Sequence, residues 1–174
     1  MVQKIASLID ETLMAMNAHL HVQMTNEEKA YLDAHFELIQ IKKGEHLMNR
    51  GDEVCYLYYL EAGTIQLSFP DKGKREISAR FIEPKEFINF SLSHEEQLSH
   101  YNVKALEHSK VWRLSKHDLQ QLYDLSINFN KLARLHLEKS INQKIKREED
   151  FHKLDAEEPV SYTHLRAHET LANL

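Results

Sequence analysis

The chain of 174 residues contains little glycine, proline or cysteine: four, three and one residue, respectively. The single cysteine, Cys55, excludes an internal disulfide and every zinc or iron–sulfur site that needs several thiolates. Long apolar runs are also missing, and charges interrupt the first 16 residues, so the sequence predicts neither a membrane span nor a signal peptide. We therefore expect a cytoplasmic protein with no membrane partner.

The sequence also lacks an excess of positive charge. Its formal net charge is −5, whereas domains that bind nucleic acid by bulk electrostatics are usually basic. With 42 % hydrophobic and 28 % charged residues, the composition is that of a globular protein and not of a disordered one.

Patterns that would indicate catalysis are missing too. The glycine spacings of phosphate loops and dinucleotide sites do not occur, and no local motif marks Cys55 as a nucleophile. The chain has twelve histidines, but the pairs His19/His21 and His164/His168 have no obvious third ligand. The sequence therefore predicts no enzyme activity, no metal site and no cofactor.

The N-terminal region has the pattern of helices. Apolar residues spaced by three and four predict a first helix: Ile5, Leu8, Ile9, Leu13 and Met16. Thr25 and Glu28 have the spacing of a capping box, which predicts that a second helix starts at Thr25.

From Phe36 to Leu114 the apolar residues recur with a period of two, as in strands. The alternation is clearest in Ile65–Phe69 and Ile77–Phe81, and further short strands are expected at 101–106 and 110–114. Cys55 is expected to be a small buried hydrophobe within a tyrosine-rich strand. Many short strands separated by turns indicate an antiparallel barrel or jelly roll.

The four glycines all lie between expected strands, and we interpret them as barrel turns: Gly44, Gly51, Gly63 and Gly73. Glycine suits tight reversals because it accepts positive φ. The segment Pro70–Gly73 has the composition of a hairpin turn, in which proline presets φ and Gly73 takes positive φ.

The C-terminal part is again helical. Ser115 and Asp118 resemble a capping box that opens a short helix through Leu122. One long amphipathic helix is then predicted by a stripe of apolar residues: Ile127, Leu132, Leu135, Leu137, Ile141 and Ile145. A helix of about 25 residues would extend about 38 Å, farther than a small barrel is wide. A second copy is its simplest partner, which predicts a homodimer through Leu137, Ile141 and Ile145; alternatively, the whole stripe packs on the barrel.

These patterns together predict an α+β fold. Its parts are N-terminal helices (1–35), a β-barrel or jelly-roll sensor domain (36–114), a short helix plus the long dimerisation helix (115–158), and a tail (159–174).

The barrel region resembles that of a known family. Five short motifs carry the likeness by their order: Lys42–Glu45, Leu47–Met48, Gly51–Asp52, Tyr56–Leu60 and Gly63. They are similar to the first half of the cyclic-nucleotide-binding barrel of the Crp/Fnr transcription regulators, and Ala105–Glu107 with Val111–Ser115 resembles the strand pair that closes that barrel. The resemblance implies a sensor barrel in which an effector shifts the dimerisation helices and so positions a DNA-binding helix-turn-helix domain.

Family members that bind cyclic nucleotides have Gly-Glu after an aromatic residue and an arginine shortly before a strand alanine. Aligned on Pro84 and Ala105, Asn89 and Phe90 stand at the Gly-Glu positions and Ser99 stands at the arginine. We therefore expect a degenerate site that does not bind cyclic AMP in the family's manner. Either a pocket for an unknown small effector or a vestigial loop is formed by the residues that remain: Asn89, Phe90, Ser99, His100 and Tyr101.

The resemblance ends at Glu158. Family members continue into the helix-turn-helix domain, and the 16 residues from Pro159 to Leu174 cannot form one with a core of its own. We expect a regulator truncated before its DNA-reading domain, with a foreign or a short natural tail, so that DNA binding would need a domain absent here. The alternative function is a stand-alone small-molecule-binding barrel that acts through protein contacts.

Overall fold

The computed structural model describes residues 4–16, 23–73, 75–88 and 98–157, the last eight without their side chains. The chain divides into two units between His136 and Leu137. The first unit contains every strand that the structure describes, and the boundary falls within helix α4 (Ile127–Glu157), which continues into the second unit.

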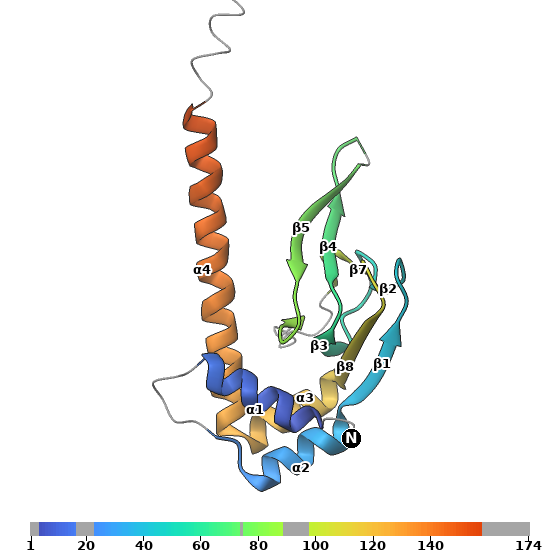
Figure 1. Ribbon diagram of the computed structural model, residues 1–174, viewed down its shortest axis with the longest axis vertical. Helices are drawn as coiled ribbons and strands as arrows, with labels where there is room; N and C mark the ends of the chain where they lie inside the picture. Colours follow the sequence, from blue (N-terminus) through green and yellow to red (C-terminus); the bar gives the residue numbers. More distant parts are fainter. Residues whose placement is uncertain (1–3, 17–22, 74, 89–97, 158–174) are drawn as a thin grey trace, which may run out of the picture. The chain divides into compact units, whose positions relative to one another are not determined.

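Eight antiparallel strands form two four-stranded sheets, which confirms the predicted jelly roll (Figure 1). The first sheet has the order β1 (Glu37–Ile41), β8 (Ser109–Ser115), β3 (Tyr56–Ala62) and β6 (Phe87–Ile88). The second has the order β2 (His46–Met48), β7 (Asn102–Ala105), β4 (Ile65–Pro70) and β5 (Glu76–Ile82). Strand β6 is not expected from the sequence, because two residues are too few to show an alternation.

Both sheets contribute apolar side chains to one core. Leu57 and Leu60 of β3 are fully buried, as is Ile65 of β4, and Val103 of β7 is 1 % exposed. Tyr59 is also fully buried, and its hydroxyl is satisfied by polar partners in helix α1 (Ile5–Met16), namely the Thr12 hydroxyl and the Leu8 carbonyl.

Strand β5 departs from the predicted alternation, whereas β4 keeps it. A bulge in β5 shifts the register between Leu67 and Ser68, which lie opposite Arg80 and Ser78. Ser68 also lies opposite Asn102 on the polar face, where it is fully buried. Ile77 lies opposite Phe69, whereas Phe81 lies opposite Gln66, which puts Ile77 and Phe81 on opposite faces. Both are exposed, at 43 % and 50 %. The expected single apolar face of this strand is therefore wrong.

Three of the four glycines have positive φ: Gly44, Gly51 and Gly63. The expectation of positive φ at Gly73 is wrong, because its φ does not lie in the positive range. Hydrogen bonds between Asp71 and Arg75 close the hairpin instead. The Asp71 carboxylate accepts from the Arg75 amide at 2.8 Å, and the Asp71 amide donates to the Arg75 carbonyl at 2.8 Å. Cys55 is also not the buried hydrophobe that was expected, since it is exposed and precedes β3.

The helices begin where their capping residues predict. Helix α2 (Asn26–His35) has the complete capping box of Thr25 and Glu28. Helix α3 (Lys116–Leu125) has half of a capping box, in which the Ser115 hydroxyl accepts from the Asp118 amide. The Asp118 carboxylate accepts from the Ser115 hydroxyl, whereas a complete capping box has it accept from the Ser115 amide. Helix α4 spans Ile127–Glu157.

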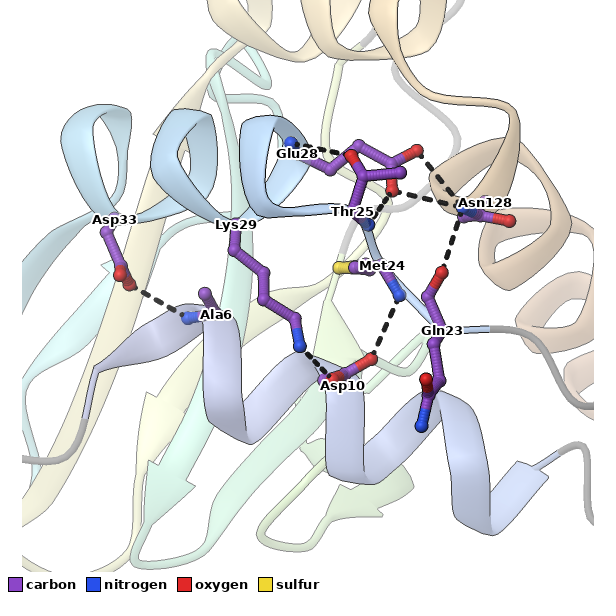
Figure 2. A network of polar contacts seen from close by, with 9 residues as sticks. All are labelled: Ala6, Asp10, Gln23, Met24, Thr25, Glu28, Lys29, Asp33 and Asn128. Atoms are coloured by element: carbon purple, nitrogen blue, oxygen red, sulfur yellow. Dashed lines mark hydrogen bonds and ion pairs between the residues drawn. The ribbon is translucent and has the colours of Figure 1, made fainter.

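The first two helices are joined by a polar network (Figure 2). Asp10, only 6 % exposed, accepts from the Met24 amide at 3.2 Å and pairs with Lys29 at 2.6 Å. Farther along, the Asp33 carboxylate accepts from the Ala6 amide at 3.0 Å. The buried carboxylate of Asp10 is thus compensated by a cation and by a backbone amide.

Glu28 links α2 to the beginning of α4. Its carboxylate accepts from the Thr25 amide at 2.6 Å, from the Ser126 hydroxyl at 2.6 Å and from the Asn128 amide group at 3.0 Å. The Ser126 hydroxyl in turn accepts from the Phe129 amide in the first turn of α4. Burial alone would raise the pKa of Glu28, but the hydrogen bonds from Asn128, Ser126 and Thr25 outweigh it and lower the pKa.

Gly63 should tolerate a side chain much less than Gly44. Gly44→Ala meets no atom within 4 Å, so only its φ of +87° is strained, and we expect a loss of about 1 kcal/mol. At Gly63, with φ of +100°, a Cβ would overlap the Ser109 side chain and lie 2.9 Å from the Ser109 Cα. We expect Gly63→Ala to lose at least about 3 kcal/mol, measured by urea unfolding. Equal losses for the two variants would contradict this.

Glu28→Gln should lower the free energy of unfolding by about 2 kcal/mol at neutral pH, because it removes the charge that accepts three hydrogen bonds. Since the folded pKa of Glu28 is lowered, its contribution is complete above the unfolded pKa near 4.5 and is lost as the pH falls toward the folded pKa. Denaturant unfolding at several pH values measures this.

The control is Glu27→Gln on the next, exposed residue, for which we expect a change below about 1 kcal/mol. If the free energies of unfolding of Glu28→Gln and of the parent chain differed by the same amount down to pH 3, this would contradict the assigned role of the charge.

Candidate functional site

Ser99, predicted from the sequence to stand at the arginine position of the family pattern, is fixed by hydrogen bonds just before β7. It is 8 % exposed, its carbonyl accepts from the Gly51 amide at 2.8 Å, and its amide donates to the Asp52 carbonyl at 2.9 Å. Its hydroxyl donates to the Tyr101 carbonyl at 2.7 Å. Ser99 thus carries no charge, and its hydroxyl hydrogen is already used within its own segment.

The structure brings together only part of the expected ligand set. The Tyr101 ring is 38 % exposed and lies 6.2 Å from the Phe69 ring, centroid to centroid. His100 is exposed, and its side chain forms no hydrogen bond with a residue that the structure describes. Asn89 and Phe90 lie outside the described residues.

A polar cluster lies on the outer face of the second sheet, next to this segment. The Glu76 carboxylate accepts from the Ser68 hydroxyl at 2.5 Å and from the Asn102 side chain at 3.4 Å, and these bonds lower the pKa of Glu76. Asn102 also accepts from the Arg50 amide at 2.9 Å. This cluster joins β4, β5 and β7 to the loop that contains Arg50. Its polar groups bind one another.

Arg80 of β5 is a cation that the sequence pattern assigned to the outer face. The bulge places it opposite Leu67, whose side chain packs against the core, so Arg80 shares the inner face of the sheet. Its guanidinium pairs with the Glu86 carboxylate at 3.0 Å, and the two side chains are 20 % and 16 % exposed. The alternation in the sequence does not reveal this position, because a bulge reverses the alternation for the residues that follow it along the strand.

Within the described part of the chain, no group of three or more histidine, cysteine, aspartate or glutamate side chains could hold a metal ion. None of the described helices is long and apolar enough to cross a membrane.

Residues 38–126 match the family described as cyclic nucleotide-binding domain. A sequence comparison with curated proteins gave no match. Three solved structures illustrate the likeness of fold. A cyclic nucleotide-binding domain from Methylobacillus flagellatus has 18 % identity and a TM-score of 0.64, covering 86 % of this chain and 84 % of its own.

The other two come from transcription regulators. The sensor domain of DNR from Pseudomonas aeruginosa has 16 % identity and a TM-score of 0.59, covering 85 % of this chain and 95 % of its own. The c-di-GMP-responsive regulator CLP from Xanthomonas campestris has 16 % identity and a TM-score of 0.63 over 75 % of this chain. The chain spans only 65 % of the length of CLP.

The family match and the structure agree on the same segment. The matched region covers more than half of the 174 residues and contains both sheets except for the first residue of β1. The chain belongs to the cyclic nucleotide-binding domain family.

Proposed function

We propose that the chain is the effector-sensing and dimerising part of a Crp/Fnr-like transcription regulator, and that it has no catalytic activity. The observation that carries the proposal is a change along α4. Phe129 and Leu132 in its first turns are fully buried, whereas Leu137, Ile141 and Ile145 are 41 %, 57 % and 48 % exposed. The beginning of the helix therefore belongs to the jelly-roll core, and its continuation presents apolar side chains.

The exposed residues of α4 suit pairing with a second copy. Leu137, Ile141 and Ile145 follow one another at intervals of four, so they share one side of the helix. Burying a side chain of this size contributes about 1.5–3 kcal/mol. Two helices that meet by a two-fold axis would bury six such side chains, which supports a homodimer.

The proposed effector is not cyclic AMP bound in the family's manner. Ser99 provides no cation for a phosphate, and Arg80, which does lie on the inner face, is already paired with Glu86. A hydrogen bond to a charged group contributes about 1.5–3 kcal/mol, so the loss of a bidentate arginine costs more than one factor of ten in affinity. The barrel is better suited to another small effector.

Calorimetric titration of the full chain tests the degenerate site. We expect no micromolar binding of cyclic AMP or cyclic GMP, because the charge that would compensate the phosphate is absent at Ser99. Cyclic di-GMP, to which the Xanthomonas campestris regulator CLP is described as responsive, is titrated in the same series. Micromolar binding of either mononucleotide would contradict the proposal.

Ile141→Glu should shift the chain from dimer to monomer at micromolar concentration, because the substitution would place charges in the middle of the proposed apolar contact. Sedimentation velocity measures the change. Gln143→Glu, which introduces the same residue on the opposite side of the helix, should leave the dimer intact. A parent chain that sediments as a monomer would contradict dimerisation through α4.

A further inference from the structure

A groove of about 590 Å³ lies between α2 and α3, away from the strands. Five residues line it: Glu27, Tyr31, Gln121, Asp124 and Leu125. The Tyr31 hydroxyl lies 3.1 Å from the Asp118 carbonyl and 3.1 Å from the Gln121 side-chain oxygen, which joins the two helices. The groove is therefore held open by bonds between its own walls and needs no ligand to form.

The lining combines carboxylates that form no ion pair within the described part of the chain with exposed apolar surface. Glu27 of α2 and Asp124 of α3 are exposed carboxylates, and neither forms an ion pair with a described residue. Leu125 is 41 % exposed, and one face of the Tyr31 ring is covered by His35, stacked at 3.8 Å between centroids. Two anionic groups on opposite walls thus flank an apolar surface.

We propose that this groove binds an arginine side chain presented by a protein partner. A guanidinium is planar and has five N–H donors, so it can donate to a carboxylate on each wall, while its methylene groups contact Leu125 and Tyr31. The negative charge of the lining complements this cation. The interaction surface is distinct from the effector-binding barrel and does not depend on it.

The openness of the groove indicates that the cation comes from a protein and not from a small molecule. Of the five lining residues, only Tyr31 is half-buried, and the others are exposed. Sites for small molecules normally cover about 70–90 % of the ligand surface, which this groove cannot do. When the arginine belongs to a protein, the residues around it on that protein bury the part of its side chain that the groove leaves exposed.

Amide chemical shifts of the full chain measure binding of a small arginine probe, the dipeptide N-acetyl-Leu-Arg-amide. We expect saturable shifts at Tyr31, Gln121 and Leu125, and an apparent dissociation constant that rises with salt because the pairing is near the surface. The dipeptide with citrulline, which has the same shape without the charge, should bind at least tenfold more weakly.

The double variant Glu27→Gln/Asp124→Asn should also weaken binding at least tenfold. Its matched control is Glu53→Gln/Glu83→Gln, which neutralises two other exposed carboxylates and should bind as the parent chain does. Unchanged binding by the Glu27/Asp124 variant would overturn the proposal, and so would the absence of saturable shifts.

Two further outcomes would assign the groove to another occupant and so overturn the proposal. Free propylguanidinium that binds as tightly as the dipeptide would point to a small organic cation. Shifts at the same three residues that appear when the chain alone is concentrated would show that a second copy fills the groove.

Discussion

One buried carboxylate holds helix α2 against the beginning of α4. Glu28 is 4 % exposed and accepts hydrogen bonds from Thr25, which caps α2, and from Ser126, which caps α4 (Figure 2 shows the Thr25 contact). The N-terminal ends of two helices therefore share one negative charge, which their dipoles favour. Because an unpaired charge in this position would be costly, the arrangement of α2 and α4 is coupled to the ionisation of Glu28.

This coupling matters because α4 has two roles along its length. Its first turns complete the jelly-roll core through Phe129 and Leu132, and Glu28 holds the residue that caps them. Beyond His136 the helix presents an apolar side. A change in the barrel that reached the Ser126 cap would alter the start of the same helix whose continuation is proposed to pair with a second copy. In the proposed function, α4 would be the element that connects the barrel to the dimer contact.

The sequence predicted the elements whose cause is local. The capping box at Thr25 and the helical spacing of Ile5–Met16 each depend on a few neighbouring residues, and both are confirmed. The face of the β5 residues was wrong, because a bulge is decided by pairing with β4 and leaves no mark on the alternation. The position of Glu28 against Ser126, 98 residues away, follows from tertiary packing. The ligand set at 89–101 stays largely a prediction, because its first half lies outside the described residues.

The same bulge bears on what the barrel can recognise. It turns Arg80 toward the inner face, where a cation without a partner would attract an anionic effector, but Glu86 neutralises it at 3.0 Å. An anion that bound Arg80 would have to displace Glu86 or be buried beside it, and either change costs free energy. In the described part of the barrel, Lys104 lies opposite Gln66 on the polar outer face and gives no substitute. Among the described residues of the barrel, Arg80 and Lys104 thus supply no free cation on the inner face, which supports the proposal of an effector recognised by shape and uncharged hydrogen bonds.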